Sequence, residues 1–235
     1  MDKGTFYFNG VNSKDTYGVI AQYKPTRKPA SRNILVGSPT NRNGSIIRDL
    51  GTYPNTNIEL SCWFKLGKST VDDINDWLNT PGYVDFIPWY DPDFTYRVKV
   101  SEEPEMGYAS ADNNYVVFSL KLTALPFKYQ TSTYKTAQTI TSGSTITNPF
   151  KYNAFPIFNI TSAGAGDVVL TVGGVSYTYK KFSSTLVVDS LIPKVSSPEL
   201  AVGLDFPILK PGGNTVTFTN ATKVTLIPRY GRRAL

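Results

Sequence analysis

The chain has 235 residues, of which 40% are hydrophobic and 13% aromatic, a composition that supports a substantial buried core and argues against disorder. It contains no histidine and one cysteine, which excludes Ser-His-Asp and Cys-His triads, an intrachain disulfide and nearly all zinc sites. The formal net charge is +6, and part of the excess lies in residues 24–48, which include six basic residues and no acidic one.

The N-terminal segment predicts short strands. Thr5–Asn9 has β-type residues and is followed by an Asn9-Gly10 turn pair, and Val19–Tyr23 predicts a second strand. The first four residues contain no apolar signal core, and no segment approaches the roughly 20 apolar residues of a membrane span. We therefore expect neither secretion nor membrane insertion, and the low cysteine content fits synthesis in a reducing compartment.

The segment from Pro25 to Gly44 is rich in Pro, Asn, Arg and Ser and predicts a long loop or extended arm, with Ser45–Leu50 returning as a hairpin after the Asn43-Gly44 turn. Its basic residues could contact an acidic protein surface, which we favour, or could be merely solvated, or could bind nucleic acid. No aromatic residue lies between Lys24 and Arg48, so no base-stacking platform is indicated. The candidate subunit-contact residues are Arg27, Lys28, Arg32, Arg42 and Arg48.

A half-buried strand and a helix are expected next. Asn57–Phe64 alternates between apolar and polar residues, which places Cys62 on the apolar face as a buried small hydrophobe rather than a reactive thiol. The spacing of the apolar residues, an N-capping hydroxyl and three early aspartates predict a helix over about Thr70–Asn79, which Pro81-Gly82 ends.

Three further strands are expected over Tyr83–Ile87, Phe94–Ser101 and Tyr115–Leu125, the last stopped by Pro126-Phe127. The polar, Thr/Ser-rich stretch from Gln130 to Asn148 predicts a linker or an exposed edge. We place the first domain at residues 1–133 and the linker at 134–153.

Residues 154–235 predict a β-sandwich, because about six short strands follow one another without a helix and Gly173-Gly174 joins two of them as a hairpin turn. The expected strands are Phe155–Thr161, Val168–Val172, Val175–Lys180, Thr185–Asp189, Thr215–Phe218 and Lys223–Pro228.

No set of residues predicts a catalytic, cofactor or metal site. Glu102, Glu103 and Glu105 could suggest a glycosidase, but like charges flanking a proline are more simply a solvated turn. Asp91 and Asp93 lack the spacing of a calcium loop and also fit a turn. Several aromatic residues could form a sugar-stacking surface, although in an all-β chain such residues more often form the core; they are Tyr7, Trp63, Trp77, Trp89, Tyr90 and Tyr129.

The order of several short motifs resembles the distal tail proteins (Dit) of siphophages, which are long-tailed, non-contractile phages. Phe6-Tyr7-Phe8-Asn9-Gly10 and then Asp15-Thr16-Tyr17-Gly18 are similar to the start of that family, and Asp76-Trp77-Leu78 to its "WL" helix. Pro126–Tyr129 is similar to the end of its first domain, but Leu125 stands before the proline and the family's cysteine is absent. Pro211–Val216 is similar to a motif of its second domain.

The resemblance implies a mainly β fold with an N-terminal β-sandwich-like ring domain, one short helix, and a C-terminal galectin-like β-sandwich. It implies a non-enzymatic, homohexameric hub that joins the tail tube to the tape-measure protein, the tail-tip protein or lysin, and receptor-binding proteins. The protein would be made in the host cytoplasm and located in the virion, where DNA passes without sequence-specific contact. A galectin-like domain also leaves open a carbohydrate-binding module that recognises host saccharide, and a hydrolase using Glu102 and Glu103 is the third alternative.

Overall fold

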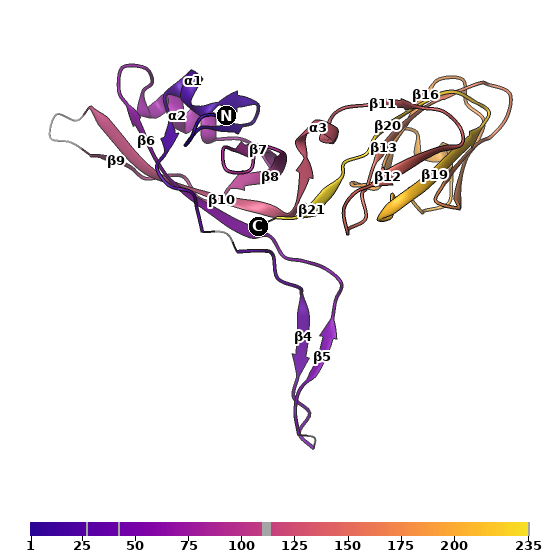
Figure 1. Ribbon diagram of the computed structural model, residues 1–235, viewed down its shortest axis with the longest axis horizontal. Coiled ribbons are helices and arrows are strands. Elements are labelled where there is room, and N and C mark those ends of the chain that lie inside the picture. Colours follow the sequence, from indigo (N-terminus) through magenta and orange to yellow (C-terminus); the bar gives the residue numbers. More distant parts are fainter. Residues whose placement is uncertain (27, 42, 110–113, 235) are drawn as a thin grey trace. The chain divides into compact units, whose positions relative to one another are not determined.

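A computed structural model describes all residues except 27, 42, 110–113 and 235, and its chain divides into two compact units (Figure 1). Unit 1 comprises Met1–Lys128 and Arg233–Leu235, and unit 2 comprises Tyr129–Arg232. Each unit has its own hydrophobic core. The chain is mainly β, as its sequence predicts, and none of the described helices is long and apolar enough to cross a membrane.

Unit 1 is built around a nine-stranded sheet in which β2, β1, β7, β8, β10, β6 and β3 are neighbours in that order, and β9 and β21 also pair with β10. The strands are β1 (Phe6–Phe8), β2 (Val11–Asn12), β3 (Ile20–Ala21), β6 (Thr56–Lys65), β7 (Val84–Pro88), β8 (Phe94–Val100), β9 (Met106–Tyr108), β10 (Tyr115–Gln130) and β21 (Gly231–Arg233). The longest pairing joins β6 and β10 over ten residue pairs, from Tyr115↔Lys65 to Ala124↔Thr56.

Strict alternation along β6 and β10 sends one set of side chains into the core of unit 1. Ile58, Leu60, Cys62 and Phe64 are buried while the residues between them are exposed or partly exposed, as expected for a strand with one face in the core. The segment before β1 meets β3 at the other end of the strand order, where Gly4 O accepts a hydrogen bond of 2.8 Å from Ala21 N. A Cβ at Gly4 would lie 2.6 Å from Ala21 O, and φ is +82° there, so this contact requires glycine.

Helix α2 (Val71–Leu78) confirms the expected helix. Thr70 is the N-cap of a capping box, in which its hydroxyl accepts from Asp73 N and its own N–H donates to the Asp73 carboxylate. Ile74, Trp77 and Leu78 are buried in the core of unit 1. One short helix was expected, but unit 1 also contains α1 (Ser13–Tyr17).

The expectation that Pro126 ends its strand is wrong, because β10 continues to Gln130. Proline lacks an N–H but keeps its carbonyl, and Pro126 O accepts a hydrogen bond of 2.8 Å from Ala234 N. Proline is tolerated here because its carbonyl still takes part in the pairing with the C-terminal segment.

The basic segment forms a hairpin of its own within unit 1. Strands β4 (Ile34–Gly37) and β5 (Ile46–Asp49) pair with each other and with no other strand in the described part of the chain. Figure 1 shows this ribbon extending away from the sheet of unit 1. The predicted arm is therefore a two-stranded hairpin, which we call the hairpin arm (residues 33–50).

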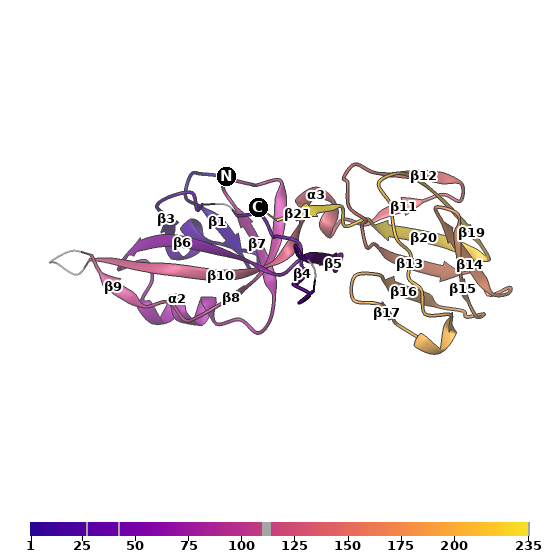
Figure 2. The ribbon, with the colours of Figure 1, turned by 90° about the horizontal axis from the view of Figure 1, so that it is seen from below.

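Unit 2 is a sandwich of two five-stranded sheets (Figure 2). One sheet has the order β11-β20-β13-β16-β17, and the other β12-β19-β14-β15-β18. Their bounds are β11 (Gln138–Ile140), β12 (Ser144–Asn148), β13 (Ile157–Ser162), β14 (Val168–Val172), β15 (Val175–Tyr179), β16 (Thr185–Asp189), β17 (Lys194–Val195), β18 (Ala201–Val202), β19 (Gly212–Thr219) and β20 (Ala221–Ile227). A short helix, α3 (Thr131–Tyr134), precedes them, and a 3-10 turn covers Pro198–Leu200. All six strands expected in this half are present.

The expected linker at 134–153 is corrected by the structure. It contains β11 and β12, which are edge strands of the two sheets of unit 2. Thr and Ser alternate there with the apolar residues Ile140 and Ile146, and such a pattern is too weak to distinguish an edge strand from a linker by sequence. Gly173 and Gly174 both have positive φ, as the predicted two-residue hairpin turn requires.

Candidate functional site

The hairpin arm exposes apolar side chains on both of its faces. Ile34, Leu35, Val36, Ile46 and Ile47 are between 50% and 66% exposed. A two-stranded hairpin is at best marginally stable in water without further packing, and contiguous exposed apolar surface is typical of interaction sites. The hairpin arm is therefore the candidate interaction surface of unit 1.

The register determines which side chains share a face of the arm. Leu35 pairs with Arg48, and Gly37 with Ile46, so these four lie on one face, because directly opposed residues share a face and alternate residues along a strand do too. We call this the Arg48 face. The other face carries Ile34, Val36, Ile47 and Asp49 by the same rule.

The base of the arm is tied to unit 1 by a cluster around Tyr53. The guanidinium carbons of Arg32 and Arg233 each lie 5.7 Å from the centroid of the Tyr53 ring, within cation-π range. Phe127 packs edge-on at 5.7 Å, and Arg233 donates a hydrogen bond to Ala30 O. The arm therefore emerges from an anchored base.

The five basic candidates have different environments. Gly51 N donates a hydrogen bond to Asp49 Oδ1, and Arg32 forms an ion pair with the same carboxylate, so that both interactions lower the pKa of Asp49. Lys28 is exposed, and its carbonyl accepts from the Thr56 hydroxyl. Arg48 is exposed and has no ion pair among the described residues. Arg27 and Arg42 lie outside the residues that the structure describes.

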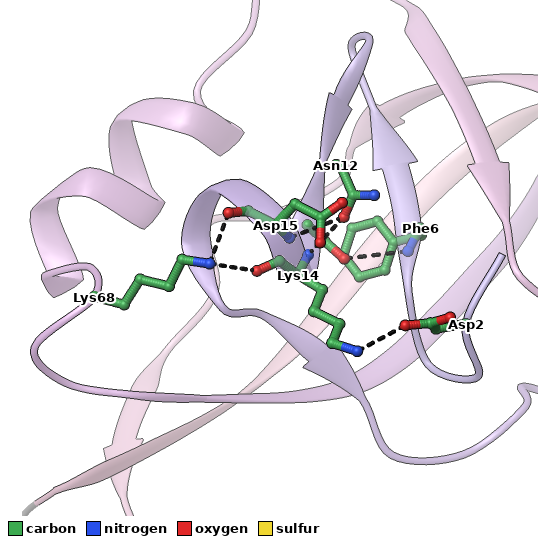
Figure 3. Close-up of polar contacts among 7 residues, drawn as sticks. Asp2, Phe6, Asn12, Lys14, Asp15 and Lys68 are labelled. Carbon is green, nitrogen blue, oxygen red and sulfur yellow. Dashed lines mark hydrogen bonds and ion pairs between the residues drawn. The ribbon is translucent and has the colours of Figure 1, made fainter.

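Polar contacts of nearby residues hold α1 in place next to the N-terminal motif (Figure 3). Asn12 caps the helix by accepting from Lys14 N and Asp15 N, both at 3.0 Å. Lys68 Nζ donates to the carbonyls of Lys14 and Asp15 at 2.9 and 2.6 Å, where a cation is favoured by the helix dipole. Phe6 N donates to the Ser13 hydroxyl. These contacts stabilise the local fold, and the sequence predicted no functional role for the residues that make them.

Some acidic residues that the sequence places in separate elements line the same groove of unit 1. Asp76 of α2 and Glu102 and Glu103 of the loop after β8 line one groove of about 370 Å³. Glu102 Oε1 pairs with Lys121 Nζ at 2.8 Å, whereas Glu105 does not line the groove. The sequence does not predict that Asp76 lies near Glu102 and Glu103, because these residues are far apart along the chain.

The residues considered for chemistry form no metal site. Within the described residues, no group of three or more His, Cys, Asp or Glu side chains is placed to bind a metal ion. Asp91 accepts from Lys128 Nζ and from the Tyr96 hydroxyl, both at 2.5 Å, in the interior of unit 1. Cys62 is 1% exposed, and burial raises the pKa of its thiol far above the usual range, which disfavours the nucleophilic thiolate.

Comparisons with known proteins identify the fold. No protein-family model and no curated protein sequence matches the chain. Among solved structures, the chain is similar to one described as "Crystal Structure of SPP1 Dit (gp 19.1) Protein, a Paradigm of Hub Adsorption Apparatus in Gram-positive Infecting Phages". The TM-score is 0.71 at 14% sequence identity, over 98% of this chain and 99% of that one. The chain therefore has the Dit fold, which the sequence motifs predicted.

Proposed function

We propose that this chain is a distal tail protein of a siphophage and acts as a structural hub at the tip of the phage tail. The observation that supports this most is the likeness to a Dit hub protein along almost the full length of both chains. Because both units are included in the match, it extends beyond a single sandwich of a kind that many unrelated proteins share. We expect no catalytic activity.

A hub of this kind would be a closed ring, and we propose a homohexamer. A closed ring needs a heterologous interface, in which one patch of a subunit meets a different patch of the next. The hairpin arm supplies such a patch, because its exposed apolar residues have no cover within the described part of unit 1. Lys28 and Arg48 would add attraction to an acidic surface, whereas Arg32 is already paired with Asp49.

The proposed partners are those of a tail-tip hub. They are the tail tube protein, the tape-measure protein, the tail-tip protein or lysin, and receptor-binding proteins. The protein would be synthesised in the host cytoplasm and assembled into the virion.

Removal of the hairpin arm tests the ring. Asn33 and Leu50 are joined by a backbone hydrogen bond of 2.9 Å, so a short Gly-Ser-Gly turn can replace residues 34–49 without straining the base. We expect six-fold rings of the wild type in negative-stain images and only monomers of the shortened protein. All three tryptophans lie in unit 1, so unchanged tryptophan fluorescence would verify its fold. A wild type that stays monomeric up to its solubility limit would contradict the ring.

Carbohydrate binding remains the alternative for unit 2. A depression lined by Ser176, Tyr177 and Asp205 has a volume of only about 70 Å³, well below the roughly 300–1,000 Å³ of typical ligand pockets. Calorimetric titration with cell-wall polysaccharide separates the two functions. We expect no saturable heat, whereas micromolar binding lost on Tyr177→Ala would favour the carbohydrate-binding module.

A further inference from the structure

The groove between α2 and the loop after β8 combines an apolar surface with uncompensated negative charge. Val100 and Pro104, both partly exposed, contribute the apolar part, and Asp76, Glu102 and Glu103 the acidic part. Lys121 neutralises Glu102, but neither Asp76 nor Glu103 has an ion pair among the described residues. The groove is therefore suited to a segment that carries both apolar groups and a cation.

One side chain of the groove also has an unused hydrogen-bonding group. Thr80 lines the groove, and its buried hydroxyl has no hydrogen-bond partner within the described residues. Buried polar groups are normally paired, so an unpaired one requires an explanation.

The Arg48 face of the hairpin arm has the complementary chemistry. It presents Leu35 and Ile46 together with Arg48, whose charge has no ion-pair partner among the described residues. On the opposite face of the arm, Asp49 is already paired with Arg32. The two faces therefore differ in charge, and only the Arg48 face offers an unpaired cation beside apolar residues.

We propose that the groove binds the Arg48 face of the hairpin arm of a second copy of this chain. Arg48 would lie between Asp76 and Glu103, with Leu35 and Ile46 against Val100 and Pro104. The occupant is a second copy because the arm and the groove are two different patches of one unit, and such a pair gives the heterologous contact that a closed ring requires. This inference rests on the proposed ring function and assigns the acceptor surface within it.

Charge reversal tests the contact. We expect Arg48→Glu, and separately Asp76→Lys combined with Glu103→Lys, to raise the concentration for half-assembly by about tenfold or more, because each leaves like charges facing across the interface. Combining all three substitutions in one chain should restore assembly to within about threefold of the wild type. Glu105→Lys and Lys3→Glu make the same charge changes on exposed residues outside the groove and the arm, and should have little effect. Mass photometry measures all of these.

Crosslinking gives a second, independent readout. The pair Arg48→Cys and Glu103→Cys in one chain should oxidise to a ladder of covalent oligomers up to six subunits, with buried Cys62 not competing. The groove assignment would be overturned if the wild type forms rings but the double-cysteine variant gives no ladder, or gives a disulfide within one chain. The proposed ring itself would still stand. Failure of the wild type to form rings at all would instead overturn the proposed function, and the inference with it.

Discussion

Arg233, near the end of the chain, places its guanidinium carbon 5.7 Å from the ring centroid of Tyr53, at the base of the hairpin arm. The same guanidinium donates a hydrogen bond of 3.3 Å to Ala30 O. The C-terminal residues thus contact the segments on both sides of the arm, because Ala30 precedes it and Tyr53 follows it. The direction of the arm depends on a residue that is remote in sequence.

Arg233→Ala should loosen the base of the arm. A partly buried cation-π contact contributes about 0.5–2 kcal/mol, so backbone amides flanking the arm at residues 30–33 and 50–53 should exchange a few-fold faster with deuterium. Arg232→Ala is the matched control, because Arg232 is the exposed neighbour on the same strand. Equal exchange in both variants would mean that Arg233 does not restrain the arm.

Asp91→Ala should strongly destabilise unit 1. Its partner Lys128 is only 3% exposed, and removal of one member of a buried ion pair costs about 3–5 kcal/mol, because the buried ammonium loses the carboxylate that pairs with it. Urea unfolding followed by tryptophan fluorescence measures this, since all three tryptophans lie in unit 1.

The exposed pair of Lys14 and Asp2 provides the control for this buried pair. Asp2→Ala should cost less than about 1 kcal/mol, because exposed ion pairs contribute little. Similar losses for Asp91→Ala and Asp2→Ala would contradict the argument from burial.

Asp73 should make the stability of unit 1 depend on pH through the start of α2. Hydrogen bonds from Thr70, first from its backbone and then from its side chain, lower the pKa of Asp73 below its usual 3.8. A lowered pKa in the folded state stabilises the fold above pH 3.8, and this contribution is lost as the pH falls through the folded pKa. The urea midpoints of the wild type and Asp73→Asn should therefore differ at pH 7 and converge toward pH 3.

Asp72→Asn serves as the control in the same pH series, because it removes a carboxylate from the same helical turn but outside the capping box. At pH 7, the urea midpoint of Asp72→Asn should differ less from that of the wild type than the midpoint of Asp73→Asn does. If the difference in urea midpoint between the wild type and Asp73→Asn stays constant from pH 7 to pH 3, the stability of unit 1 does not depend on pH through Asp73.

Cys62 should react with a thiol reagent only when unit 1 unfolds. Burial raises the pKa of its thiol and removes it from solvent, so the nucleophilic thiolate is scarce and inaccessible. We expect no colour change with Ellman's reagent in native buffer and one thiol per chain in concentrated urea. Ser61→Cys, on the exposed face of the same strand, should react at once. Rapid native labelling of the wild type would show that β6 opens readily.

Local sequence patterns predicted several elements that depend on neighbouring residues. The capping box of α2, the Gly173-Gly174 turn and the alternation along β6 depend on residues a few positions apart. The order of the short motifs also predicted the Dit fold, although no single motif is specific. The N-terminal motif forms strand β1, a turn at Asn9-Gly10 and the end of α1, where Gly18 is the C-cap.

The sequence by itself therefore determined most strands, the main helix, and a mainly β fold without histidine chemistry. Only the tertiary structure decided which distant segments meet: Ala234 N against Pro126 O, Arg233 against Tyr53, and Asp76 in one groove with Glu103. It also showed that Arg32 is paired with Asp49 of the hairpin arm, whereas Arg48 has no ion pair among the described residues. The periodicity of a sequence indicates which side of a strand is apolar. Which strand pairs with a sheet edge, and which residue pairs with a charged side chain, depends on the packing of the whole unit, and no local pattern encodes it.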